Sequence, residues 1–374
     1  MCNPNLVVHL SSVHPSFDIR IFHRECKTLA RAGYEVVLVV QHDRDEKVEG
    51  IQIRALSKPK NRLDRMTRTA WQVYRSAIKE DAQLYHLHDP ELILIGLLLK
   101  IRGKRVIYDV HEDYPSSLLS REWIHPRVRS SIVKGVTSAE WAGAVLFDGI
   151  AAATPAIAKR FPSSKTVTIQ NFPILNKLVP NTTTTTHYPQ RPPILVYIGV
   201  ISEMRGIREM VLATGLIPGH LGAQLYLAGN FSPAETEYEI KKLAGWERVK
   251  YLEWQSREGV ATLLGIARIG LVVLHPEPNH IKSQPNKLFE YMSAGIPVIA
   301  SHFPLWKEIV EKAGCGLLVN PLDPKEIAEA IGWLLEHPGE AEEMGQRGQA
   351  AVRERYNWDY EADKLLVFYQ KVIG

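Results

Sequence analysis

Short apolar runs alternate along this chain with segments in which apolar residues recur every three or four positions. LVVHLSS at 6–12 and YEVVLVV at 34–40 are typical of buried strands, and residues 19–32 between them of a helix. Further strands of this kind are predicted at 82–86, 105–110, 149–153 and 166–170. Because buried strands that alternate with helices form parallel sheets, residues 1–175 are predicted to form an α/β domain.

A segment rich in threonine and proline, residues 176–193, interrupts this alternation and predicts a linker. A second α/β series follows, so residues 194–355 are predicted to form a second domain. Its strands are predicted at 194–199, 224–229, 249–254 and 269–274, with a helix from about Ile207 after the first of them. Ligands of such sheets bind beyond the carboxyl ends of the strands, so we expect the chemistry at that edge.

The segment SQPNKLFEYMSAGIPVIAS, residues 283–301, predicts a loop, a helix, a turn and a buried strand. Asn286 suits the start of the helix, where unpaired N–H groups favour a diphosphate, and Lys287 adds a positive charge. Leu288 belongs to the apolar face of this helix. Glu290, one turn further on, can accept hydrogen bonds from both hydroxyls of a ribose. Alternatively, its carboxylate only complements the helix dipole.

Composition narrows the class of protein. The chain has 374 residues, 45% apolar and 23% charged, which is ordinary for two globular domains and excludes a disordered or fibrous chain. No apolar run reaches the roughly 18 residues needed to span a bilayer, and the first residues do not resemble a secretory signal. Cys2, Cys26 and Cys315 are widely spaced and predict reduced thiols. A cytoplasmic location is therefore expected.

Charge is unevenly distributed along the chain. Residues 1–175 contain 25 Lys and Arg against 18 Asp and Glu, and much of this excess lies in residues 58–79, among Leu63, Met66 and Trp71. Such a basic amphipathic helix can lie on an anionic membrane, which predicts peripheral attachment to the inner face of the plasma membrane. Alternatively, it is a surface helix with a solvated basic face. Nucleic acid is not expected as a partner.

Three blocks, YIGVISEMRGI, YLEWQSREGVATLLGIARIGLVVL and PNKLFEYMSAGIPVIAS, follow one another in an order and at a spacing that resemble a known family. This family is the retaining glycosyltransferases of family 4, and the resemblance is clearest from about 195 to 360. Weaker blocks, HLHDPEL, YDVHEDYP and IQNFP, precede it. The resemblance implies a GT-B fold, an α/β architecture of two Rossmann-like doubly wound domains with an interdomain cleft. It also implies that the last helix, about 356–374, crosses back to the first domain.

The resemblance assigns roles on the donor side. Glu290 matches the second acid of the family's pair and would bind the donor ribose, while Arg205 matches a basic residue that contacts the donor phosphates. Trp254 is a candidate for stacking on the base, although core packing is the more ordinary role of such a residue. The donor-binding candidates are Glu290, Arg205, Lys287, Gly199, Asn286, Leu288, Trp254 and Glu277. Arg205 and Lys287 would stabilise the leaving diphosphate, so neither a metal nor another cofactor is expected; otherwise both are solvated surface charges.

On the acceptor side, the chain has VHPSFDIR where the family usually has a glycine-rich turn. His111 matches the family's histidine near the donor sugar and is the candidate catalytic residue, with a structural histidine at a strand end as the alternative. The acceptor-side candidates are His14, Asp18, Arg20, His88 and Asp89. Lys282 stands where the family has the first acid of its pair, which reads sugar hydroxyls, and Glu277 is the candidate to substitute for that acid.

The predicted activity is retaining transfer of a sugar from a nucleotide-sugar, a UDP- or GDP-sugar, to an acceptor. A glycan or lipid-linked glycan intermediate of surface polysaccharide synthesis is the expected acceptor. One alternative is a non-hydrolysing sugar-nucleotide epimerase, which shares the two-domain fold. Another is a catalytically silent nucleotide-sugar-binding subunit, which Lys282 makes conceivable. A nicotinamide enzyme is disfavoured, because neither first strand leads into a Gly-x-Gly-x-x-Gly turn.

Overall fold

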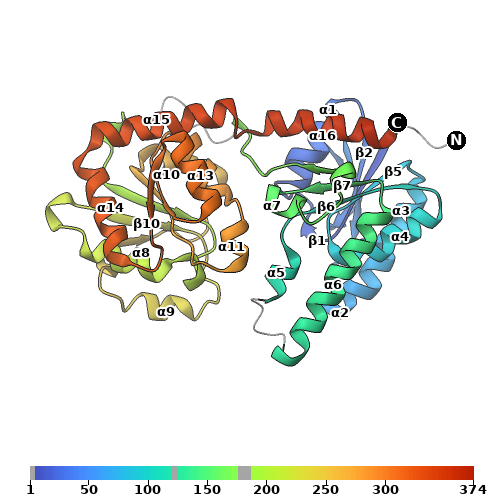
Figure 1. Cartoon of the computed structure of the whole chain (residues 1–374), viewed down its shortest axis with the longest axis horizontal. Helices are drawn as coiled ribbons and strands as arrows, with labels where there is room; N and C mark the ends of the chain where they lie inside the picture. Colours follow the sequence, from blue (N-terminus) through green and yellow to red (C-terminus); the bar gives the residue numbers. More distant parts are fainter. Residues whose placement is uncertain (1–4, 120–124, 176–186) are drawn as a thin grey trace. The chain divides into compact units, whose positions relative to one another are not determined.

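The chain forms two compact units, each with its own sheet and hydrophobic core (Figure 1). The computed structural model describes residues 5–119, 125–175 and 187–374. Unit 1 comprises Met1–Asn171 and Trp358–Gly374, and unit 2 comprises Phe172–Asn357. Unit 1 ends at Asn171 where 175 was predicted, and unit 2 begins at Phe172 whereas the second domain was predicted to begin at 194, after the linker. Most of the predicted linker lies outside the described residues.

Unit 1 is built on an eight-stranded sheet in the order β3-β4-β2-β1-β5-β6-β7-β8. Its strands are β1 (Leu6–Pro15), β2 (Glu35–Gln41), β3 (Glu46–Val48), β4 (Ile51–Leu56), β5 (Leu84–Leu87), β6 (Arg105–Val110), β7 (Gly149–Ala152) and β8 (Thr166–Thr168). Neighbours pair in parallel except β3 and β4, which pair antiparallel. β1 lies between β2 and β5, so the order of strands reverses at β1. The carboxyl ends of β1 and β5 therefore border the crevice in which such sheets bind ligands.

All the strands predicted in this part of the chain are present, and two further strands lie at one edge of the sheet. The strand β4 has a mixed sequence, IQIRAL, in which buried and half-buried residues are interspersed. Its partner β3, EKV, is short and charged, which suits an edge strand. Neither has the apolar run that marks the interior strands.

The helices of unit 1 cover both faces of the sheet. They are α1 (Lys27–Arg31), α2 (Arg62–Asp64), α3 (Ala70–Glu80), α4 (Ile93–Ile101), α5 (Tyr114–Leu119), α6 (Pro126–Leu146), α7 (Pro155–Ala158) and α16 (Trp358–Ile373). The helix predicted at 19–32 starts with a π-helical turn, η1 (Ile21–Cys26). The N–H of Glu25 donates to the carbonyl of Arg20, five residues back. Such turns are inserted in helices at functional sites more often than elsewhere.

The last helix, α16, packs in unit 1. Trp358 Nε1 donates a hydrogen bond to Thr28 Oγ1 at 2.9 Å. Phe368 lies against Gly149 at the start of β7, where an added Cβ would come within 2.5 Å of the Phe368 ring. Unit 1 therefore combines two segments that are far apart in the sequence.

Unit 2 has a six-stranded sheet, β11-β10-β9-β12-β13-β14, in which all neighbours are parallel. The strands are β9 (Ile194–Ile198), β10 (Gln224–Ala228), β11 (Val249–Tyr251), β12 (Ile269–Val272), β13 (Val298–Ser301) and β14 (Gly316–Val319). The helices are α8 (Ile207–Leu216), α9 (Thr236–Ile240), α10 (Arg257–Ile266), α11 (Pro278–Lys282), α12 (Asn286–Ser293), α13 (Pro304–Ala313), α14 (Pro324–Glu336) and α15 (Pro338–Glu354). Here the chain leaves β9 toward β10 on one side, and β12 returns on the other.

Candidate functional site

Two glycines shape the turns that follow β9 and β10 in unit 2. Gly199 has a φ of +123° and Gly229 a φ of +148°, conformations that other residues rarely adopt. An added Cβ at Gly229 would lie 1.9 Å from the carbonyl oxygen of Gly199, so the two turns pack backbone against backbone. This leaves the carboxyl end of β9 without a side chain over it, at the position where a ligand approaches such a sheet.

Lys287 lies beside this turn as the second residue of α12. Its side chain is buried, with Nζ 3.9 Å from the centroid of the Tyr197 ring. A Cβ built on Gly199 would be 3.5 Å from Nζ, so no side chain separates the ammonium from the turn. Nζ has no hydrogen-bond partner among the described residues, and burial together with Arg205 lowers the pKa of Lys287 well below its usual value. A buried ammonium at a helix start is suited to bind a phosphate.

The other donor-side candidates lie around the same helix. Arg205 ends the 3₁₀ turn η7 (Glu203–Arg205) and is half-buried, Asn286 is the first residue of α12, and Glu290 is half-buried one turn later. Leu288 is fully buried and its N–H donates to the carbonyl of Pro285, so the structure gives no support to a donor contact there.

Glu277 and Lys282 stand at the two ends of α11. Glu277 is the residue before the helix and Lys282 its last residue, so both belong to the element that precedes α12.

Trp254 follows β11 and is 70% exposed, so the core-packing interpretation of this residue is wrong. Stacking on a base stays a prediction.

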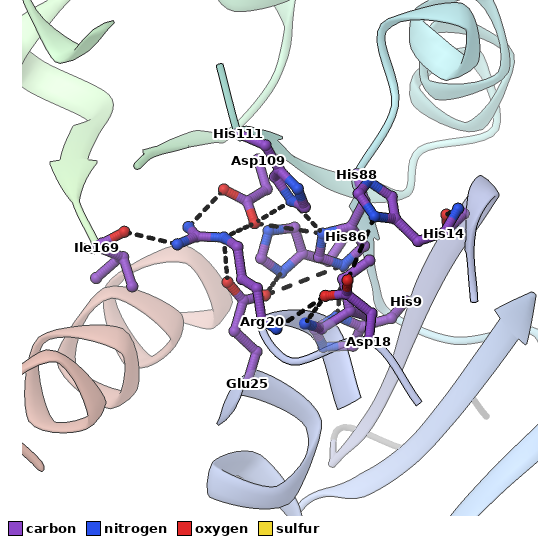
Figure 2. Close-up of polar contacts among 12 residues, drawn as sticks. His9, His14, Asp18, Arg20, Glu25, His86, His88, Asp109, His111 and Ile169 are labelled. Atoms are coloured by element: carbon purple, nitrogen blue, oxygen red, sulfur yellow. Dashed lines mark hydrogen bonds and ion pairs between the residues drawn. The ribbon is translucent and has the colours of Figure 1, made fainter. Parts of the chain in front are cut away.

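In unit 1, polar side chains gather at the carboxyl ends of β1, β5 and β6 (Figure 2). His9 on β1 and His86 on β5 are register partners, and His88 and His111 follow the ends of β5 and β6. We call this group the histidine cluster. Its members are His9, Arg20, Glu25, His86, His88, Asp109, His111 and Tyr369.

An arginine and an aspartate hold the catalytic candidate of this cluster in place. Arg20 donates from Nη2 and Nε to the two carboxylate oxygens of Asp109 at 2.7 and 2.8 Å, and from Nη1 to the carbonyl of Ile169 at 2.8 Å. His111 Nε2 lies 2.9 Å from Asp109 Oδ2. Burial opposes the charge of Asp109, but Arg20 and His111 outweigh it and keep the pKa of that carboxyl well below its usual value.

Deeper in the cluster, His9 Nδ1 lies 2.8 Å from His88 Nε2, and His86 Nδ1 lies 2.5 Å from the Tyr369 hydroxyl. Glu25 is also fully buried. Burial lowers the pKa of His88 to about 4 and, reinforced by Asp109, raises the pKa of Glu25 well above its usual value. These groups are therefore poor proton carriers near neutral pH.

The acceptor-side candidates are not equally accessible. Arg20, His88 and Asp89 are buried, and Asp89 Oδ2 accepts hydrogen bonds from Ser11 Oγ at 2.9 Å and from the Ser12 N–H at 2.6 Å. Burial favours a structural role for these three. By contrast, His14 and Asp18 are half-buried.

His14 and Asp18 form one unit with the start of η1. His14 Nδ1 lies 3.6 Å from Asp18 Oδ2, and Asp18 Oδ1 accepts from the N–H groups of Arg20 and Ile21. The His14 ring also lies against the His111 ring, with centroids 4.8 Å apart. The structure thus places these two candidates beside the catalytic candidate.

The sequence analysis missed five members of the cluster: His9, Glu25, His86, Asp109 and, from a distant part of the chain, Tyr369. Period-two spacing was the available signal, because HLH at 86–88 and DVH at 109–111 put two polar residues on the same face of a strand that is otherwise apolar. No local pattern indicates Glu25 or Tyr369.

The basic segment 58–79 forms a helical stretch of α2, the π-helical turn η2 (Arg65–Thr69) and α3. Leu63, Met66 and Trp71 are exposed. Two of its arginines make ion pairs, Arg65 with Glu91 at 2.6 Å and Arg68 with Asp64 at 3.0 Å, which reduces the charge available to a partner. Among the described residues, no helix is both long enough and apolar enough to cross a bilayer.

Comparison with known proteins gives two family matches. Residues 20–172 match glycosyltransferase family 4 and residues 184–351 match the glycosyl transferases group 1. The chain is 26% identical over 173 residues to the MMP alpha-(1->4)-mannosyltransferase of Mycolicibacterium hassiacum, covering 46% of this chain and 41% of that protein. It is 26% identical over 192 residues to the phosphatidyl-myo-inositol mannosyltransferase of Mycobacterium leprae, covering 50% and 48%. The matched region therefore spans less than half the length of either relative.

Solved structures resemble nearly the whole chain. The sucrose-phosphate synthase of Thermosynechococcus elongatus has a TM-score of 0.79 at 20% identity, with 98% of each chain covered. HepE of Anabaena, solved with UDP and glucose, has a TM-score of 0.74 at 15% identity, covering 97% of this chain and 98% of that one. Two parallel α/β units with these neighbours define the GT-B class of glycosyltransferase, which confirms the predicted fold. Together with the two matches, which cover most of the chain, this shows that the chain belongs to glycosyltransferase family 4.

Proposed function

We propose that this glycosyltransferase moves a sugar from a UDP- or GDP-sugar to a glycan or lipid-linked glycan, with retention of anomeric configuration. The observation that carries the donor half of this proposal is the buried Lys287 ammonium, which has no hydrogen-bond partner among the described residues and lies beside the bare turn at Gly199. HepE, a structural neighbour, binds UDP and glucose, which supports a nucleotide-sugar donor.

The chemistry proposed for the donor side is stabilisation of the leaving diphosphate by cations. Lys287 and Arg205 would face the negative charge that develops as the bond to the sugar breaks. The phosphates of a bound donor would favour the charged form of Lys287, and a cation at a buried position acts strongly on such a transition state. Metal-independent transfer is proposed on this basis. We assign no enzymic nucleophile.

On the first unit we propose that His111 hydrogen-bonds the transferred sugar. Asp109 fixes one ring nitrogen of His111 at 2.9 Å, which sets the direction of the other. His14 and Asp18, which lie beside it, are the candidates for contact with the acceptor.

The donor site is tested by the thermal stabilisation of the protein with a panel of nucleoside diphosphates and nucleotide-sugars. We expect one nucleoside diphosphate to raise the melting temperature by several degrees, because a ligand at 100 times its Kd contributes about 2.7 kcal/mol. Glu290→Ala should abolish this shift through loss of the ribose contact. No shift with any nucleotide would overturn the proposed donor site.

The same panel separates the competing functions. Transfer requires both donor and acceptor for turnover, whereas an epimerase would consume donor alone. If the protein binds the nucleotide-sugar but transfers sugar to none of the acceptors tested, it is the silent subunit. This is a second candidate because Lys282 replaces the family's first acid.

The lipid-linked acceptor rests on the exposed apolar residues of the helical stretch 62–80, which would hold unit 1 to an anionic bilayer. Cosedimentation with vesicles of anionic phospholipid at physiological salt should pellet the protein. Trp71→Ala should reduce the bound fraction severalfold. If both proteins remain in the supernatant to the same extent with and without vesicles, membrane attachment is contradicted.

A further inference from the structure

We propose that His9, Glu25, His86 and His88 bind one zinc-type divalent cation inside unit 1. All four side chains are fully buried, and each offers a ligand atom within 4.8 Å of the others. Figure 2 shows the three imidazoles and the Glu25 carboxylate turned toward one another, although they come from three different elements: β1, η1 and the end of β5. This inference does not depend on the proposed sugar transfer.

The distances suit four ligands of one ion. In a tetrahedral zinc site with bonds near 2.0 to 2.1 Å, neighbouring ligand atoms are about 3.3 Å apart. His9 Nδ1 and His88 Nε2 are separated by 2.8 Å, and Glu25 Oε2 lies 4.0 Å from both His88 Nε2 and His86 Nδ1. Small side-chain movements bring these separations to that value.

Hydrogen bonds alone leave this group unsatisfied. Arg20 Nε lies 3.0 Å from Glu25 Oε1, yet within the described part of the chain neither carboxylate oxygen of Glu25 accepts a hydrogen bond. Buried carboxylates are normally paired, hydrogen-bonded or bound to a metal. A cation held by Glu25 Oε2 supplies the missing partner.

The outer contacts of two of the imidazoles also match those of metal ligands. His88 presents Nε2 to the site and Nδ1 to Asp109 Oδ2, 3.3 Å away, and that carboxylate is held by Arg20. His9 Nε2 lies 3.2 Å from the Tyr369 hydroxyl. Metal-binding histidines almost always donate their second N–H to a carboxylate or another oxygen in this way.

Ligand chemistry and burial define the kind of site. Three imidazoles and one carboxylate suit Zn²⁺ better than Mg²⁺ or Ca²⁺, which take oxygen ligands. With four protein ligands and no solvent-exposed side, the ion would be structural, joining β1, β5 and η1 beneath His111. It would not touch the donor diphosphate.

Metal content tests this proposal directly. The purified protein, freed of loosely bound ions by gel filtration, should contain close to one zinc per chain, and Glu25→Gln should lower this at least tenfold. The matched control is Glu209→Gln, which alters a carboxylate that lies 2.9 Å from a histidine, His275, in unit 2, and should leave the zinc content unchanged.

A second readout keeps the test valid if Glu25→Gln folds poorly. Chelator-treated wild-type protein should gain about 5 °C or more in melting temperature with Zn²⁺ at 100 times its Kd, and Co²⁺ should give the visible absorption of a tetrahedral site. A wild-type protein that contains no metal and gains neither stability nor absorption would overturn the proposal. The cluster would then be a proton-sharing network.

Discussion

Lys287 combines a charge, deep burial and no hydrogen-bond partner, so its contribution should depend on the ligand state of the protein. We predict that Lys287→Met leaves the free energy of unfolding of the nucleotide-free protein unchanged or raises it by about 1 to 2 kcal/mol, because a buried unpaired ammonium is costly. The same substitution should remove the thermal shift caused by a nucleoside diphosphate. Urea unfolding and thermal melts measure the two effects.

Lys250→Met is the matched control for that substitution. Lys250 is exposed in the same unit and its Nζ lies 5.0 Å from the centroid of the Tyr226 ring, a similar contact without the burial. It should retain the nucleotide shift. Loss of the nucleotide-dependent thermal shift in both variants would mean that binding depends on the overall charge of the protein and not on Lys287 in particular.

His14 should make stability depend on pH. Burial disfavours its imidazolium, but the hydrogen bond to Asp18 and the charge of Asp89 outweigh it and raise the pKa of His14 above 6.5. A raised pKa stabilises the folded protein fully below the unfolded pKa, and this contribution is lost as the pH rises through the folded pKa. We predict that the wild type loses stability relative to His14→Ala as the pH rises above about 6.5, the ordinary value for histidine. NMR titration of the imidazole and urea unfolding across this range check the prediction, and equal slopes for both proteins would contradict it.

At the scale of single elements, Gly206 shows how a turn and a helix depend on one residue. It precedes α8 with a φ of +74°, and an added Cβ would lie 1.9 Å from the carbonyl oxygen of Val273. Gly206→Ala should therefore destabilise unit 2 by about 3 kcal/mol or more, from backbone strain and displacement of β12.

Gly222→Ala provides the control, because its φ of +61° is similar but the nearest atom to its Cβ would be Pro193 Cγ at 3.7 Å. Only the backbone strain of about 1 to 2 kcal/mol should remain. Chemical unfolding of the two variants separates clash from strain, and equal losses would show that the contact at Val273 relaxes.

Elements with strong apolar periodicity were predictable, and the site elements were only partly so. Runs such as YEVVLVV and ILVYIG determine interior strands, because their burial on both faces leaves few other conformations. The π-helical turn at Ile21–Cys26 was not predictable from the apolar pattern. Its one extra residue changes the direction in which Arg20 and Glu25 point. Its cause lies in contacts to β6 and the histidine cluster, far away in the sequence.

For the whole molecule, the last helix links distant parts of the chain within unit 1. Phe368 is 6% exposed and packs on Gly149, whereas the adjacent Val367 is 65% exposed. Phe368→Ala should lower the stability of unit 1 by about 3 to 5 kcal/mol, and Val367→Ala by less than about 0.5 kcal/mol.

Calorimetry distinguishes these two substitutions if each unit melts in its own transition. Phe368→Ala should shift only one of the two transitions, the melting of unit 1, because Phe368 packs in that unit. Displacement of both transitions would show that the units do not unfold independently.

The candidate site in unit 1 also depends on contacts between residues that are far apart in the sequence. This limits how many of its side chains could be predicted from the sequence alone. Lys287 and Glu290 are recognisable because one helix carries both. Asp109, which holds His111, lies on β6 and is bound in turn by Arg20, the residue before η1. Tyr369, which contacts His9 and His86, lies far from them in the sequence. Side chains separated by 283 residues share no local pattern.

The construction of unit 1 from both ends of the chain also sets an order of events during synthesis. Unit 2 is continuous in sequence and can fold once Asn357 has left the ribosome, whereas the sheet of unit 1 lacks Phe368 and its histidines lack Tyr369 until later. The part of unit 1 that precedes unit 2 in the sequence is thus translated before unit 2 but reaches its final packing after it. Nascent unit 1 would be the part of this protein that most needs chaperone protection.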